Sequence, residues 1–144
     1  MKVLFDTSAL VAGIVEAHPA HSRAFSWLSR ALKKDLEFFV SAHSLLELYA
    51  VLTRMPLQPR ITPGMARRLI RANVETRAVV VTLTKKDYSV VIDEMAELGL
   101  SGGVVYDALI ARCARKLACD VLLTLNENDF HRVWPDNAGV VTGC

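Results

Sequence analysis

Short runs of consecutive apolar residues, separated by longer stretches of helical periodicity, are the feature that most constrains the fold of this chain. They lie at residues 3–5, 38–40, 78–81 and 121–123, with a fifth at 139–141. A strand that is apolar on both faces must be covered on both faces, as in parallel sheets flanked by helices. We therefore predict an α/β fold, a three-layer α/β/α sandwich with a central parallel sheet of four to five strands.

The stretches between these runs predict helices. Spacings of three and four between apolar residues, together with capping residues and proline or glycine breaks, place them at 9–16, 20–34, 43–54, 63–75, 85–98 and 104–118. The chain has 144 residues, with no internal repeat and no Gly/Ser-rich linker. This length suits one domain with one sizeable core, so we predict a single domain over residues 1–144.

Composition excludes several classes of protein. No apolar stretch approaches the roughly 20 residues of a membrane span. Asp6 stands where the apolar segment of an export signal would begin and Glu16 ends the run, so we predict no export signal. Three cysteines without a C-x-x-C pair fit a reducing cytoplasm, and His18 and His21 lack the cysteine pair of a zinc site. No G-x-G-x-x-G follows the first strand, which argues against dinucleotide binding. The hydrophobic fraction of 52% fits either a large core or an apolar surface buried against a partner.

Basic residues gather in one segment. The formal net charge is only +2, but four arginines lie close together, at Arg60, Arg67, Arg68 and Arg71. Arg67 and Arg71 are four residues apart and share a face of the predicted helix. Such a patch would attract a polyanion such as RNA, although a merely solvated helix face remains an alternative.

Acidic residues mark the candidate site. Asp6 directly follows the first predicted strand, where ligands bind in open parallel sheets. Glu47 interrupts a helix that is apolar nearly all round and so predicted to be buried, which makes an unpaired carboxylate costly. Asp107 shares a helix face with Ile110 and Ala111.

Each acid also has a structural explanation. Asp6, with Thr7 and Ser8, could simply cap the following helix. Glu47 could pair with Arg54, and Asp107 could interact with the positive end of its helix dipole. If the acids converge instead, their mutual repulsion raises their pKa values. Oxygen ligands of this kind suit Mg²⁺ or Mn²⁺, which can activate water for attack on phosphorus.

Four segments together resemble PIN-domain nucleases, and more narrowly the VapC-type toxins of bacterial toxin–antitoxin pairs. They are V-L-F-D-T-S-A-L at 3–10, L-L-E-L at 45–48, Y-D-A-L-I-A at 106–111 and L-L-T-L-N-E-N-D-F at 122–130. The resemblance implies that Asp6, Glu47 and Asp107 are catalytic and hold the metal. It also implies that hydroxyl residues support them, namely Thr7, Ser8 and Thr124.

The fourth acidic position departs from the pattern of this family. Many PIN domains have Asp two residues after the threonine that matches Thr124, whereas this chain has Asn126 there. Asn126 still offers an oxygen ligand, and Asp129 lies one turn further along if a helix begins there. Both are therefore candidate metal ligands, with Asp129 also a candidate catalytic acid. Leu125 replaces a basic residue common among VapC relatives.

The resemblance implies a cytoplasmic, Mg²⁺- or Mn²⁺-dependent endoribonuclease that acts on RNA, forms a homodimer and is inhibited by a small antitoxin. Two alternatives remain open. A non-catalytic RNA- or protein-binding PIN scaffold would not need all three acids. A phosphatase with an Asp nucleophile at Asp6 would favour a second Asp where Ser8 stands.

Overall fold

The computed structural model describes all 144 residues and has the predicted α/β architecture. Its sheet contains five parallel strands in the order β3-β2-β1-β4-β5. The strands are β1 (Lys2–Phe5), β2 (Glu37–Ser41), β3 (Val79–Val81), β4 (Val121–Thr124) and β5 (Val141–Gly143). The fifth strand begins two residues later than predicted because Gly139, with φ +82°, belongs to the preceding turn.

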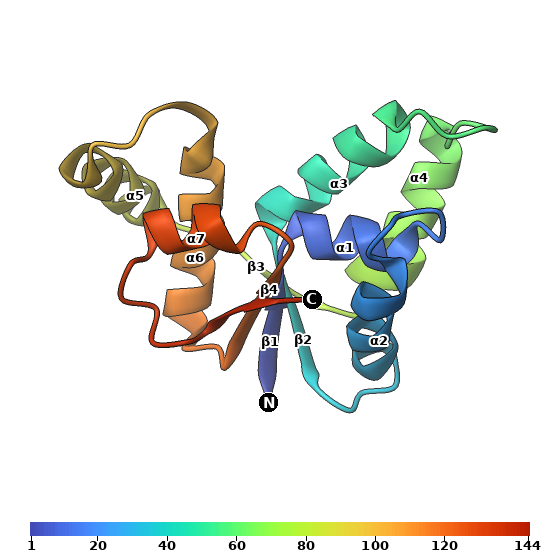
Figure 1. The fold of residues 1–144 in the computed structure, drawn as a ribbon, viewed down its shortest axis with the longest axis horizontal. Coiled ribbons are helices and arrows are strands. Elements are labelled where there is room, and N and C mark those ends of the chain that lie inside the picture. The colour runs from blue at the N-terminus through green and yellow to red at the C-terminus, as the bar shows by residue number, and fades with distance from the viewer.

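Helices cover both faces of the sheet. On one side lie α1 (Thr7–Ile14), α2 (His21–Leu32), α3 (Ala42–Arg54) and α4 (Pro63–Ile70), which continues as a π-helical turn (Arg71–Glu75). On the other lie α5 (Lys85–Leu98), α6 (Val105–Leu117) and α7 (Glu127–Val133), with a short 3₁₀ turn (Gly102–Val104) before α6. Figure 1 shows these two helical layers with the sheet between them.

The strands divide their side chains between the two layers. Val3 and Phe5 of β1 pack with the α1–α4 layer, whereas Leu4 packs with the α5–α7 layer, and all three are fully buried. Successive strand residues point to opposite faces, so a strand between two helical layers needs an apolar residue at every position. This explains the uninterrupted apolar runs of the sequence.

The strand order places a crevice between β1 and β4. From β1 the chain adds β2 and β3 on one side, then crosses over to add β4 and β5 on the other. At such a switch point the flanking helices diverge to opposite faces, and the carboxyl ends of the two central strands border an open crevice. Asp6 follows β1, and Thr124 is the last residue of β4. The backbone N–H of Asp6 donates to the carbonyl of Leu123, 2.9 Å away, which joins the two strand ends.

One prediction about α3 is wrong. Its apolar composition predicted a helix buried all round, but Leu46 is 74% exposed, and Tyr49 and Val51 are each 40% exposed. Only the face that carries Leu48 and Leu52 is buried in the core. None of the helices is both long and apolar enough to cross a membrane.

Candidate active site

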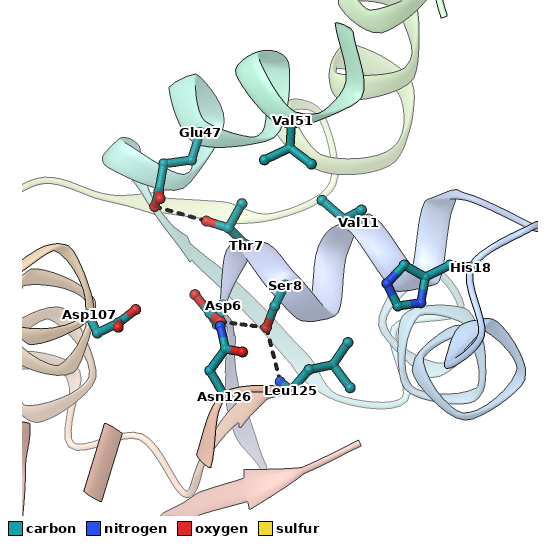
Figure 2. A pocket seen from close by; sticks show the side chains of 10 residues that line it. All are labelled: Asp6, Thr7, Ser8, Val11, His18, Glu47, Val51, Asp107, Leu125 and Asn126. Carbon is teal, nitrogen blue, oxygen red and sulfur yellow. Dashed lines mark hydrogen bonds between the residues drawn. The ribbon is translucent and has the colours of Figure 1, made fainter. Parts of the chain in front are cut away.

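A pocket of about 370 Å³ opens at the carboxyl ends of β1 and β4, and it contains most of the predicted site residues. Asp6, Glu47 and Asp107 come from segments far apart in the sequence and line it together with Asn126 (Figure 2). Thr7 and Ser8 also line it, and Thr124 lies beneath them. The predicted convergence of the acids on one pocket is therefore present in the structure.

Asp6 is held by hydroxyl groups rather than used as a helix cap. It is only 2% exposed, and its side chain makes no capping hydrogen bond to α1. Its Oδ2 accepts hydrogen bonds from Ser8 Oγ at 2.6 Å and from Thr124 Oγ1 at 2.9 Å. Burial raises the pKa of this carboxyl, and the two hydroxyl hydrogen bonds oppose the rise. No lysine or arginine forms a salt bridge with it.

The two hydroxyls are themselves oriented by the backbone after β4. Ser8 Oγ accepts from the N–H of Leu125, and Thr124 Oγ1 accepts from the N–H of Asn126, both at 2.9 Å. A hydroxyl that accepts in this way has its single hydrogen free to donate. Both hydrogens go to Oδ2 of Asp6, so neither hydroxyl bonds to Oδ1.

Glu47 is positioned by neighbours on two helices. Its Oε1 accepts a hydrogen bond from Thr7 Oγ1 at 3.1 Å, and the buried Nε2 of His43 lies 3.2 Å from the same oxygen without hydrogen-bond geometry. The His43 ring stacks on Tyr106, with centroids 5.1 Å apart and planes within 10°, and so connects α3 to α6. The expected alternative partner, Arg54, forms no salt bridge with Glu47.

Asp107 shows that the acids interact. Burial raises its pKa to about 7, and the negative charges of Asp6, Asp129 and Glu47 add to the rise. A helix N-terminus would lower the pKa of an acid in the first turn. The pKa of Asp107 is instead raised, chiefly by burial and then by the neighbouring like charges.

The two candidates for the fourth ligand occupy different places. Asn126 lines the pocket, whereas Asp129 lies one turn into α7, outside it. The Asp129 carboxylate is about half exposed and lies 3.3 Å from Nη1 of Arg132. It therefore acts on the pocket through its charge, whereas Asn126 contributes to the pocket wall itself.

The donor set fits a hard divalent cation in its chemistry. Three carboxylates and an amide oxygen are the ligands that Mg²⁺ and Mn²⁺ take, and a cation would relieve the repulsion that raises the pKa of Asp107. No three His, Cys, Asp or Glu side chains are already gathered around one point, so these acids would have to turn inward to bind an ion.

The predicted basic residues lie away from the pocket. Arg60 is in the loop between α3 and α4, Arg67 and Arg68 are on α4, and Arg71 begins the π-helical turn. Arg67 forms an ion pair with Glu75 at 2.8 Å. None of the four lines the pocket.

Two histidines near the site were not predicted as part of it. His18 lines the pocket, but the sequence had singled it out only as a zinc ligand to be rejected. His43 precedes Glu47 by four residues, the spacing of neighbours on one helix face, and this spacing could have identified it.

Comparison with known proteins identifies the class. The family model for the PIN domain matches residues 3–134, so this chain belongs to the PIN-domain family. Among characterised relatives, it is similar to Ribonuclease VapC27 of Mycobacterium tuberculosis, with 33% identity over 109 residues that cover 76% of this chain and 74% of the relative. Ribonuclease VapC40 of the same species is 35% identical over 117 residues, 81% of each chain.

Solved structures have the same fold at lower identity. VapBC2 of Rickettsia felis, bound to a DNA fragment from its promoter, superposes with a TM-score of 0.68 at 18% identity, covering 100% of this chain and 99% of that one. VapC20 of Mycobacterium tuberculosis, a toxin that cleaves the sarcin–ricin loop, has a TM-score of 0.66 at 17% identity, covering 85% and 87%. The resemblance seen in the sequence and the predicted fold class are confirmed.

Proposed function

We propose that this chain is a divalent-metal-dependent endoribonuclease and the toxin of a VapBC-type pair. The observation that carries the proposal is the convergence of Asp6, Glu47 and Asp107 on one pocket. The proposal is also supported by the 33–35% sequence identity of this chain to two ribonucleases of the VapC type. The same proposal takes residues 1–144 as one cytoplasmic domain.

Each side chain of the pocket has a distinct task in this proposal. Asp6, Glu47, Asp107 and Asn126 would hold Mg²⁺ or Mn²⁺, which when bound supplies a Lewis acid and lowers the pKa of water. Ser8 and Thr124 fix the Asp6 carboxylate, leaving Oδ1 clear of both hydroxyls. Thr7 holds Glu47. Without a cation, the clustered negative charge repels the RNA backbone.

The proposal includes two protein partners, a second copy of the chain and a small antitoxin. Apolar side chains outside the pocket stay exposed on two helices, with Leu46 and Tyr49 on α3 and Ile92 on α5. Leu46 and Tyr49 lie one turn apart on α3, and an exposed apolar helix face of this kind is a candidate for a surface that another chain covers. Light scattering of the purified chain, alone and with the product of a neighbouring reading frame, tests both partners.

The central experiment incubates the purified chain with RNA and Mn²⁺, with and without a chelator. Asp6→Asn and Asp107→Asn should each reduce cleavage by more than the roughly 10–100-fold that loss of an outer-shell partner costs. Asp35→Asn is the matched control. Asp35 is exposed and lies just before β2, at the amino ends of the strands, whereas the pocket lies at their carboxyl ends.

Each other outcome has a defined meaning. Cleavage that persists unchanged in Asp6→Asn and Asp107→Asn would refute the site. Hydrolysis of p-nitrophenyl phosphate without RNA cleavage would indicate the phosphatase, and RNA binding without turnover would indicate a binding module.

A further inference from the structure

The pocket has a second end, away from the acids. Val11 lies four residues after Thr7 on α1, and Val51 lies four residues after Glu47 on α3. Both helices therefore extend the pocket by one turn, about 6 Å. Leu125 adds a third apolar side chain, and His18 completes the far end (Figure 2).

His18 offers one donor to this end of the pocket. Its Nδ1 accepts a hydrogen bond from the backbone N–H of Ala20 at 3.0 Å, so Nδ1 carries the lone pair. A neutral imidazole with its lone pair on Nδ1 has its proton on Nε2. The ring makes no other hydrogen bond, which leaves Nε2–H free for a ligand.

The loop between α1 and α2 fixes the position of this ring. The N–H of His18 donates to the carbonyl of Val15 at 3.0 Å, and the N–H of His21 donates to the carbonyl of His18 at 2.9 Å. The His21 ring differs from that of His18. Its Nδ1 lies 2.8 Å from the carbonyl oxygen of Ala12, so it must donate there, and the ring stacks on Phe25. His21 therefore anchors the loop, while the donor of His18 stays available.

The residues that line this end of the pocket indicate which chemical class of ligand it can bind. Neither lysine nor arginine lines the pocket, so this end has no formal positive charge for a phosphate. Three apolar side chains and a neutral N–H instead suit a flat group with an acceptor at its edge. The whole pocket, with its acidic end included, has a volume of about 370 Å³, within the roughly 300–1,000 Å³ of small-ligand pockets.

We propose that this end of the pocket binds an RNA base next to the cleaved bond. The base packs on Val11, Val51 and Leu125, and an acceptor atom at its edge accepts the Nε2–H of His18. His18 is thus a specificity-determining residue, a role that rests on the proposed function. It gives the enzyme a base preference at one position beside the cleavage point.

The test uses three substitutions that separate the donor from the loop contact. His18→Ala removes both. His18→Asn places an amide near the position of Nδ1, so it can still accept from Ala20 N–H but cannot reach the ligand. His18→Gln places its amide near the position of Nε2 and restores the donor. Circular dichroism and thermal unfolding establish that each variant is folded.

The first measurement is the sequence preference of cleavage on RNA with a randomised loop and Mn²⁺. We expect His18→Ala and His18→Asn to flatten the preference at one position by about 3–10-fold, the worth of one hydrogen bond, and His18→Gln to retain most of it. An equal loss of cleavage at every sequence would indicate a phosphate contact and overturn base recognition. Unchanged preference in His18→Ala, or its loss in His18→Gln but not in His18→Asn, would also overturn it.

A second measurement separates this inference from the proposed function. RNA is selected from the same random pool by Asp6→Asn, with and without His18→Ala. A preference that disappears with His18→Ala supports the base pocket even if the parent chain cleaves nothing, in which case only the nuclease proposal fails. Selection that is identical with and without His18→Ala refutes the base pocket whether or not the parent chain cleaves RNA.

Discussion

Replacing Asp107 by Asn should stabilise the protein while abolishing its proposed activity. Burial and the neighbouring acids raise the pKa of Asp107 from its ordinary 3.8 to about 7 in the folded chain. Well below its unfolded pKa of 3.8 the group is protonated in both folded and unfolded states, so its charge has no effect on stability. As pH rises from 4 to 7, the unfolded chain loses the proton first, and the folded state becomes less stable by comparison.

The size of the effect follows from this difference in pKa. For a fully shielded carboxyl it would correspond to roughly 4 kcal/mol at pH 8. Asp107 is only about half buried, so solvent screening reduces the penalty, and we expect about 1–2 kcal/mol. The neutral amide avoids this penalty, and the melting temperature should rise by about 3–8 °C for a chain of this size.

The assay is thermal unfolding with a chelator present, at pH 8 and at pH 4.5, for the parent chain, Asp107→Asn and Asp35→Asn. The gain of Asp107→Asn should be large at pH 8 and shrink at pH 4.5, while the exposed control should stay near the parent at both. A gain of the same size at both pH values, or a loss at pH 8, would refute the electrostatic reasoning.

Three further predictions follow from the site and its surroundings. Mg²⁺ or Mn²⁺ at 100 times its Kd should raise the free energy of unfolding by about 2.7 kcal/mol, which calorimetry would measure; an equal rise in Asp6→Asn would contradict the ligand assignment. Thr124→Val removes the donor to Asp6 and the acceptor for Asn126 N–H, so RNA cleavage should fall roughly 10–100-fold; unchanged cleavage would show that the hydroxyl is dispensable. Arg68→Ala and Arg71→Ala should weaken RNA binding equally for all sequences and reduce the slope of log K against log salt by about 0.7 each, and an unchanged slope in a salt titration would show that neither arginine contacts phosphate.

The sequence predicted the elements of the fold well because it encodes their local causes. Uninterrupted apolar runs located β1, β2 and β4 to within one residue at each end, and Gly99 marked the end of α5. The burial of α3 could not be predicted in this way. An apolar composition shows that a helix can be covered, but the face that carries Leu46 and Tyr49 is left open because no other element of the chain packs there.

The site residues also divide into those that local sequence features predict and those that depend on tertiary packing. Asp6 and Asp107 could be predicted because each stands at the end of a strand or the start of a helix, places that topology brings together. The choice between Asn126 and Asp129 depends on where α7 begins, which the sequence left conditional. His18 could not be assigned to the pocket from the sequence. Its place there depends on the packing of the loop after α1 beside residues from α3 and α6, which no local pattern reports.

The pair of hydroxyls around Asp6 limits which residues positions 8 and 124 can tolerate. Each must accept a hydrogen bond from a main-chain N–H and donate its own hydrogen to Asp6, so the residue must be donor and acceptor at once. Alanine and valine can do neither, and cysteine does both only weakly. In a saturation library scored for cleavage, serine and threonine should interchange at these two positions, and other residues should be depleted.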